Sequence, residues 1–351
     1  MDSIKLPVIF VFGLVLISCK KDKPEPVTIE GFNNGIVVLC EGLFQQNNSS
    51  ISWINKSNEA VSNGVFNVVN DRHLGDTGND LLHYGSKIYV AVNASSTIEI
   101  LDANTFKASN QVIMEAGGMA KQPRYLEGHN GKVYISCFDG FVDVLDTVTG
   151  TVLNRIAVGW NPDGMTQLND YLYVSNSGGL NFPTMDSTVS VIDLNTDAEL
   201  IKVTVGLNPG DIEASSNGNI YVISRGDYGA IPSKLVKIDP ATFQTTDLLT
   251  DVLEINPFGP DEFLITYENA GGVSIGVFNA VSEQLTNADL INTANITTVY
   301  EAVFNEQDQL IYVLDAMGYS NTGYVRAYDV NGNFVKDYHV GLNPTDLIVL
   351  P

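Results

Sequence analysis

A short run of residues typical of a buried strand recurs seven times along this chain, about every 46 residues. Most copies read Ile-Tyr-Val or a close variant. A period of this length, with several strands in each repeat, is typical of one blade of a β-propeller. We therefore predict an all-β fold, a seven-bladed β-propeller. The copies lie at residues 36–38, 88–90, 133–135, 172–174, 220–222, 263–265 and 311–313.

Each copy is followed by a second, more alternating strand that ends at an Asp or Asn. The side chain of such a residue accepts hydrogen bonds from backbone N–H groups just ahead of it and closes a tight hairpin. We interpret these residues as turn formers, so the acids among them are not paired as catalytic carboxylates. They are Asn55, Asp102, Asp146, Asp193, Asp239, Asn279 and Asp329.

A Val-Gly-x-Asn-Pro pattern marks three crossings between repeats, at residues 158–162, 205–209 and 340–344. Gly permits unusual backbone angles and Pro interrupts a strand, so the segment leaves one blade and enters the next. The last copy is followed by one more strand pattern and then the chain stops, whereas the first blade begins at its second strand. We therefore predict that residues 347–350 supply the missing inner strand of blade one and close the ring.

The chain is strongly acidic, with 18 basic and 41 acidic residues among its 351 and a formal net charge of −23. Four basic and four acidic residues precede residue 31, which leaves 14 basic and 37 acidic residues for the ring. A field of this sign repels phosphate backbones and anionic lipid head groups. We expect no nucleic-acid partner, and membrane contact only through an anchor.

The first residues resemble an export signal. Lys5 precedes an apolar run at residues 6–17, which is too short to span a bilayer, and the run ends in Leu16-Ile17-Ser18-Cys19. This ending resembles the bacterial lipobox, and the resemblance implies cleavage before Cys19 and attachment of lipid to it. The domain prediction is a signal peptide at 1–18, a lipidated Cys and tether at 19–30, and the propeller at 31–351.

The residues that usually carry catalysis or bind metal form no recognised constellation. The four histidines, His73, His83, His129 and His339, have no zinc-type spacing. We predict no catalytic residue, no metal ligand set and no cofactor, although Asp and Glu leave calcium open as a ligand. Cys40 and Cys137 end equivalent strands of blades one and three, too far apart for a disulfide, and we expect buried thiols.

Aromatic and Arg residues gather in the loops that follow the core strands and in the crossings between blades. These connections all meet on one face of a propeller, and several of them are long. Long loops with Trp, Tyr and Arg on one face describe a binding surface. The candidate ligand-binding residues are Phe44, Arg72, Arg124, Phe138, Trp160, Phe182, Arg225, Tyr228, Tyr267 and Tyr319.

Five segments of the mature chain resemble surface-lipoprotein propellers of Bacteroidota, of the YVTN-repeat type. They lie at residues 35–42, 74–80, 87–93, 122–125 and 206–209. This wider family includes lipoproteins that capture cobalamin at the cell surface and sit over a TonB-dependent transporter. The resemblance implies an outer-membrane, lipid-anchored and surface-exposed monomeric ring that binds a small-molecule nutrient on its loop face. The candidate ligands are a corrinoid such as cobalamin, a haem-like ring or a glycan.

Two other classes of function stay open. One is a propeller enzyme, such as a lactonase, a lyase or a quinoprotein, and the other is a protein-interaction scaffold. An enzyme needs metal ligands or an acid–base pair near the axis. If the loop face binds ligand, a Trp160→Ala, Tyr228→Ala double variant should keep its fold and lose binding.

Overall fold

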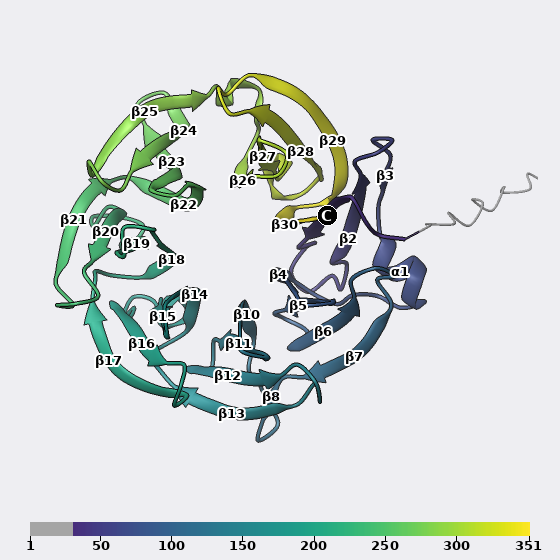
Figure 1. The fold of residues 1–351 in the computed structure, drawn as a ribbon, viewed down its shortest axis with the longest axis horizontal. Helices are drawn as coiled ribbons and strands as arrows, with labels where there is room; N and C mark the ends of the chain where they lie inside the picture. The colour runs from purple at the N-terminus through teal and green to yellow at the C-terminus, as the bar shows by residue number, and fades with distance from the viewer. Residues whose placement is uncertain (1–30) are drawn as a thin grey trace, which may run out of the picture. The chain divides into compact units, whose positions relative to one another are not determined.

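The computed structural model describes residues Gly31–Pro351, which form a closed ring of seven four-stranded antiparallel sheets (Figure 1). Each sheet is one blade, with one strand lining the central axis and the others stepping outward. This confirms the all-β, seven-bladed propeller predicted from the repeat. The signal peptide at 1–18, the lipidated Cys19 and the tether at 19–30 lie outside the described residues.

The strands are best given by their position in the blade, from blade one to blade seven. The innermost strands are β30 (Pro344–Leu350), β4 (Gly78–Tyr84), β10 (Pro123–His129), β14 (Pro162–Leu168), β18 (Pro209–Ala214), β22 (Val252–Gly259) and β26 (Val299–Asn305). The second strands are β1 (Gly35–Cys40), β5 (Lys87–Val92), β11 (Lys132–Cys137), β15 (Tyr171–Asn176), β19 (Ile220–Ser224), β23 (Glu262–Asn269) and β27 (Leu310–Asp315).

The third strands are β2 (Ser50–Asn55), β6 (Thr97–Asp102), β12 (Phe141–Asp146), β16 (Thr188–Asp193), β20 (Lys234–Ile238), β24 (Gly272–Asn279) and β28 (Thr322–Asp329). The outer strands are β3 (Val61–Ser62), β7 (Ala108–Ile113), β13 (Val152–Ala157), β17 (Ala198–Thr204), β21 (Thr245–Thr250), β25 (Gln284–Ile291) and β29 (Phe334–Leu342). A small hairpin of β8 (Glu115–Ala116) and β9 (Met119–Ala120), the helix α1 (Val65–Asn70) and the 3₁₀ turns η1 (Gly179–Asn181), η2 (Thr293–Asn295) and η3 (Met317–Tyr319) complete the elements.

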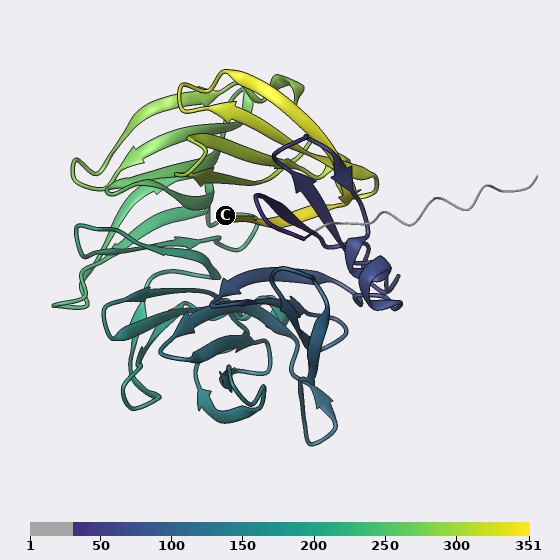
Figure 2. The same cartoon turned by 45° about the vertical axis from the view of Figure 1, so that its right-hand side comes forward.

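The two ends of the propeller sequence meet in blade one. There β30 pairs antiparallel with β1, with Val38 opposite Leu347 and Gly35 opposite Leu350. Figures 1 and 2 show this yellow C-terminal strand beside the purple strands β1 and β2. The predicted closure is therefore confirmed, and every inner strand of the ring has a pairing partner.

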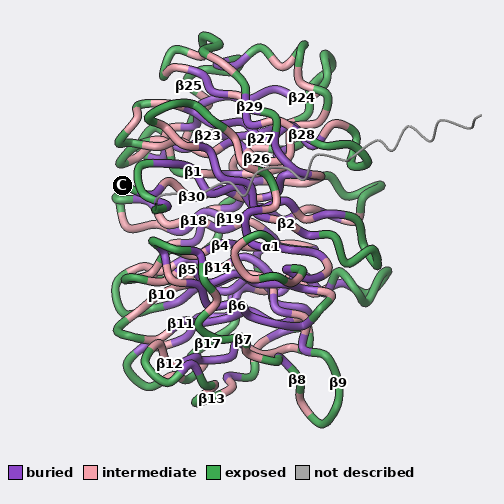
Figure 3. Tube along the Cα trace, turned by 90° about the vertical axis from the view of Figure 1, so that its right-hand side faces the viewer, coloured by how far each residue is buried: buried purple, intermediate pink, exposed green. Residues whose placement is uncertain are grey.

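The hydrophobic core lies between neighbouring blades, as the purple layers of Figure 3 indicate. The tyrosine of the repeat is one of the largest side chains in the core and is buried in all five second strands that carry it. Two of these hydroxyls reach the next blade: Tyr134 donates to Asp197 at 2.6 Å, and Tyr221 donates to the Ala280 carbonyl at 3.1 Å. The recurring tyrosine thus both fills the core and fixes one blade against the next.

The predicted turn chemistry is confirmed at the ends of all seven third strands. Each Asp or Asn accepts at least one backbone N–H from two to four residues ahead, as when Asp102 accepts from Asn104 at 3.2 Å and from Thr105 at 3.0 Å. The equivalent bonds form at Asn55, Asp146, Asp193, Asp239, Asn279 and Asp329. These side chains accept hydrogen bonds from the local backbone, and they lie at the ends of the third strands, away from the axis.

All seven inner strands carry a β-bulge just after their first residue. In a regular strand, successive side chains point to opposite faces. A bulge breaks that alternation and re-aims a side chain. Consecutive residues such as Tyr300 and Glu301, or Thr345 and Asp346, therefore both face the central channel.

The cysteines and the helices complete the description. Cys40 and Cys137 are buried free thiols, and burial raises the pKa of Cys40 to about 11. Among the helices of the part that the structure describes, none is long and apolar enough to cross a membrane.

Candidate ligand-binding site

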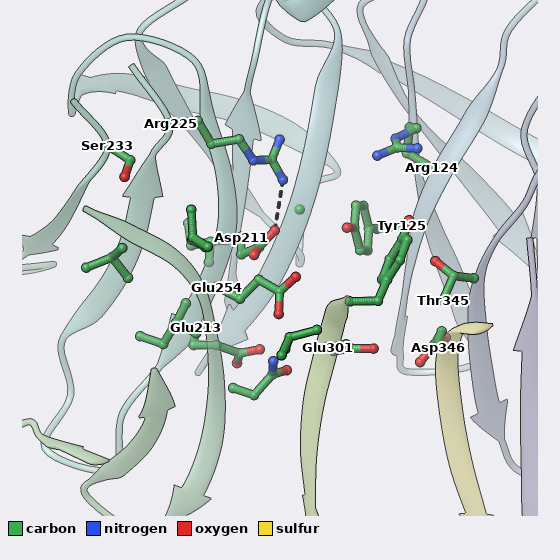
Figure 4. Close-up of a pocket in the computed structure, with 18 of the residues that line it drawn as sticks. Arg124, Tyr125, Asp211, Glu213, Arg225, Ser233, Glu254, Glu301, Thr345 and Asp346 are labelled. Carbon is green, nitrogen blue, oxygen red and sulfur yellow. Dashed lines mark hydrogen bonds and ion pairs between the residues drawn. The ribbon is translucent and has the colours of Figure 1, made fainter. Parts of the chain in front are cut away.

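A cavity of about 1020 Å³ occupies the loop end of the central channel. Its wall comes from the inner strands of all seven blades, and its rim includes the loops after β19 and β27. Cavities that hold small molecules usually measure roughly 300–1,000 Å³, so this one is large enough for a sizeable ligand. Figure 4 shows that the labelled side chains on its wall are mostly charged or polar.

Two arginines and two aspartates form an ion-pair cluster at the rim. Arg124 of β10 donates through Nε to Asp163 of β14 at 2.9 Å, and Arg225 donates to the other Asp163 oxygen at 2.8 Å. Arg225 also donates to Asp211 of β18 at 2.9 Å, the bond drawn in Figure 4. Arg124 further bonds the side chain of Asn79, so both guanidinium groups are held by the protein itself.

The pKa of Asp163 follows from this cluster. Burial alone would raise the pKa of this carboxyl, but Arg124 and Arg225 outweigh that effect and hold the pKa below its usual value. Asp163 is therefore a carboxylate at neutral pH, locked between two cations. The side chain of Phe138 supports the cluster, because the Arg124 guanidinium lies 4.8 Å from the centre of its ring.

Below the rim, one position of the inner strand carries a carboxyl group in five of the seven blades. This position directly precedes the residue that pairs with the third residue of the repeat, as Leu81 pairs with Val90, and all seven of its residues line the cavity. Going round the ring from blade two, they are Asp80, Tyr125, Gly164, Asp211, Glu254, Glu301 and Asp346.

Two of these acids bond to the next blade. Asp346 accepts the backbone N–H of Leu81 at 2.6 Å, and Asp80 accepts that of Leu126 at 2.8 Å. Glu254 and Glu301 have no such partner. Among residues 31–351, no donor reaches the buried Oε2 of either glutamate, and both side chains face the cavity (Figure 4). Buried polar atoms in proteins normally have a hydrogen-bond partner, so these two oxygens call for one.

Burial and mutual repulsion raise the pKa values of the channel carboxyls. Burial raises the pKa of Asp346 to about 6. Burial, assisted by repulsion from Glu127 and Asp211, raises the pKa of Glu213 to about 8. The pKa values of Glu254 and Glu301 are also raised well above the ordinary value, first by burial and then by neighbouring acids. With a pKa of about 8, Glu213 is largely protonated at neutral pH.

The residues predicted as ligand contacts fall into two groups. Arg124, Arg225, Tyr228 and Tyr319 line the cavity. Phe138 lies directly behind Arg124. Tyr228 and Tyr319 are 73% and 53% exposed, so their rings are free to cover a ligand at the mouth.

The remaining predicted residues do not line the cavity. Phe44, Trp160 and Phe182 are exposed on loops at the same end of the blades but outside the cavity wall. Arg72 lies away from the channel, where it forms a bidentate pair with the buried Glu99 at 2.8 and 2.7 Å. Tyr267 was expected in a loop, but β23 continues through it to Asn269, and its hydroxyl bonds to the Ala288 carbonyl.

The sequence analysis missed the channel carboxyls. The signal was present in the sequence, because an acid stands at the same position of the inner strand in five blades, directly before Leu81, Ile212, Ile255, Ala302 and Leu347. The bulges hid it, since two consecutive channel-facing residues contradict strand alternation. In the part of the chain that the structure describes, no three His, Cys, Asp or Glu side chains converge closely enough to hold a metal ion.

Comparison with solved structures places the ring among other propellers. A quinoprotein alcohol dehydrogenase-like protein from Bacteroides thetaiotaomicron is 15% identical with a TM-score of 0.67, covering 91% of this chain and 79% of its own. Hydrazine synthase from Kuenenia stuttgartiensis is 15% identical with a TM-score of 0.62, covering 76% of this chain and 88% of its own. The computationally designed protein Ika8 is 12% identical with a TM-score of 0.51 over the same shares. At these identities the likeness shows the fold alone.

No curated protein matches the chain. A family does match, over residues 34–342, which is nearly all of the seven-bladed ring. The chain belongs to this family, DUF5074, which is described as a domain of unknown function.

Proposed function

We propose that this protein is a lipid-anchored cell-surface binding protein that captures a small nutrient molecule in the axial cavity and passes it to an outer-membrane transporter. The observation that carries the proposal is the cavity of about 1020 Å³ with buried carboxyl oxygens that lack a donor. A preformed, polar, concave site at the axis of a rigid ring is suited to binding, because the protein pays little ordering entropy when the ligand enters.

The exposed tyrosines at the rim support the same proposal. Tyr228 and Tyr319 stand on the loops after β19 and β27, where they can close over a ligand without disturbing the blades. Corrinoids, haem-like rings and glycans remain the candidate ligands suggested by the sequence resemblance. The lipobox at Cys19 supports the anchor, and a TonB-dependent transporter is the proposed recipient.

An experiment can distinguish ligand binding in the cavity from ligand binding on the outer loops. The full-length protein in detergent is titrated with cobalamin, haem and a panel of glycans by calorimetry. A Tyr228→Ala, Tyr319→Ala variant should weaken binding of the active ligand about tenfold or more, because both rings line the cavity. The matched Phe44→Ala, Phe182→Ala variant removes two exposed rings outside the cavity and should bind as the unchanged protein does.

Three results bear on the proposal. Saturable binding that fails only in the tyrosine variant supports it. Equal loss in both variants would place the ligand on the loop surface instead, and no binding across the panel would count against small-molecule capture.

The lipid anchor needs a separate test. Cys19→Ser should abolish incorporation of labelled palmitate, and incorporation that persists would contradict the lipoprotein assignment.

A propeller enzyme is the second candidate, and one observation favours it. Glu213 lines the cavity with its pKa raised to about 8, chiefly by burial. A carboxylic acid of this kind is suited to donate a proton in general acid catalysis. Ligand turnover by the unchanged protein that is lost in Glu213→Gln would favour this candidate over simple capture.

A further inference from the structure

The positive charges of the rim arginines Arg124 and Arg225 are already paired within the protein. Arg124 is bonded to Asp163 and Asn79, while Arg225 is bonded to Asp163 and Asp211. An anionic ligand would have to displace a buried carboxylate to reach either guanidinium group. The cavity therefore has no ready site for an anion, although it contains two arginines.

The polar groups of the cavity that remain unpaired are acids. After the arginine pairs are counted, Glu213, Glu254 and Glu301 line the cavity without any ion-pair partner in the described ring. The Oε2 atoms of Glu254 and Glu301 are buried, and no donor among residues 31–351 reaches them. These two residues sit at equivalent positions in adjacent blades, so a ligand in the channel meets both from one side.

The spacing of the acids distinguishes between kinds of cation. A metal ion needs several oxygens converging on one point, and the carboxyls of residues 31–351 do not converge in this way. They are distributed round the wall, one from each of several blades. A ligand that fits this pattern carries two or more positive donor groups separated by a flexible or apolar spacer.

The aromatic side chains complete the match. Tyr300 and Tyr319 line the same cavity and pack edge to face, with ring centres 6.1 Å apart. Tyrosine rings attract ammonium groups and pack against methylene chains. Tyr300 directly precedes Glu301 in β26, and Tyr319 packs against Tyr300.

We propose that the axial cavity binds an organic polyamine, with ammonium groups on Glu254 and Glu301 and the carbon chain against Tyr300 and Tyr319. This inference rests on the proposed function in placing the ligand in the cavity, and it names the chemical class of that ligand. Each ammonium donates to a carboxyl oxygen that otherwise has no partner, so binding satisfies the two buried atoms.

The test uses spermidine as the probe, titrated by calorimetry into the full-length protein in detergent at about 0.15 M salt and about pH 7.5. We expect saturable binding of one spermidine per chain. A Glu254→Gln, Glu301→Gln variant keeps the side-chain shape and removes the charge, and it should weaken binding about tenfold or more. N1,N8-diacetylspermidine, which lacks both terminal charges, should bind comparably weakly to the unchanged protein.

The control must account for the acidity of the whole chain, because any polycation is attracted to a protein of net charge −23. Glu306→Gln removes an exposed charge from the turn after β26, at the opposite end of that strand from Glu301. It should leave spermidine affinity unchanged. Equal loss in Glu306→Gln and the double variant, or equal affinity for the diacetylated compound, would overturn the proposal.

Two further outcomes separate this inference from the proposed function. Binding of cobalamin, haem or a glycan in the cavity, without any binding of spermidine, overturns the polyamine assignment and leaves small-molecule capture standing. Competition of Mg²⁺ or Ca²⁺ with spermidine at equal concentration would also overturn the polyamine assignment. It would show that the site binds any cation and does not select an organic polyamine. Spermidine binding that depends on Glu254 and Glu301 supports both the polyamine assignment and small-molecule capture.

Discussion

Arg225 follows the second strand of blade five, yet its guanidinium group bonds to Asp163, which begins the inner strand of blade four, at 2.8 Å. Asp163 is 2% exposed and is also bonded by Arg124 from blade three. One carboxylate therefore joins three consecutive blades at the mouth of the channel. The arrangement makes the rim a rigid element and gives the first prediction.

Replacing Asp163 with Asn should lower the free energy of unfolding by about 2–4 kcal/mol, because the change leaves two guanidinium groups partly buried without their shared counter-charge. Urea unfolding followed by circular dichroism measures it. Asp170→Asn, on an exposed turn after the same strand, is the matched control and should change stability by less than about 0.5 kcal/mol. Equal stability of the two variants would show that the cluster contributes nothing to the ring.

Gly210 gives the Arg225 side chain the space it occupies. A Cβ at this position would collide with the Arg225 guanidinium group. We expect Gly210→Ala to displace Arg225 and to cost about 1–2 kcal/mol, and to cost much less in an Arg225→Ala background, where there is nothing to displace. Gly229→Ala, on the neighbouring loop with no close contact to a Cβ, is the control. Additive costs in the double-mutant cycle would contradict this reading of Gly210.

The seam of the ring gives the third prediction. Deleting residues 344–351 removes β30 and exposes the whole edge of β1. We expect loss of cooperative thermal unfolding or a large fall in Tm. The milder variant Leu347→Ala, at a position 4% exposed, should cost about 2–4 kcal/mol, whereas Val148→Ala, 88% exposed, should cost almost nothing. A truncated protein that melts like the intact one would contradict closure by β30.

Much of the architecture could be predicted because it depends on local, repeated chemistry. The Tyr of the repeat marks the second strand of most blades, and the Asp or Asn after the third strand marks its turn. The excess strand at the C-terminus and the missing one at the start predicted the seam. Each of these signals depends on near neighbours in the sequence, so periodicity was enough to find it.

The site could be predicted only in part because it depends on how the inner strands are bulged and on which residues meet across the axis. Arg124, Arg225, Tyr228 and Tyr319 were found from composition and loop length. The acids of the channel were not, because a single Asp or Glu in a short strand carries no sign that it faces four others. Arg72 pairs with Glu99 and does not line the cavity, and this too could not be read from the sequence because Glu99 lies 27 residues away, in β6.

The channel acids give the last prediction, on pH. The pKa of Glu213 in the folded protein is raised to about 8, by burial and by the facing acids Glu127 of β10 and Asp211 of β18, whereas it is about 4.3 in an unfolded chain. Between these values the folded state binds more protons than the unfolded state, so this group makes stability fall as pH rises from about 4 to about 8. Below that window the group is protonated in both states and costs nothing.

Glu213→Gln should therefore raise the free energy of unfolding by about 1–3 kcal/mol at pH ~9 and change it little at pH ~4. Urea unfolding of both proteins across this range gives the measurement, with Glu306→Gln on the exposed turn after β26 as the control of equal charge change. A gain that is the same at both pH values would mean that Gln improves packing rather than removing a buried charge. A loss of stability at pH ~9 would mean that the ionised Glu213 is stabilised by a partner and is not an unpaired acid of the channel wall.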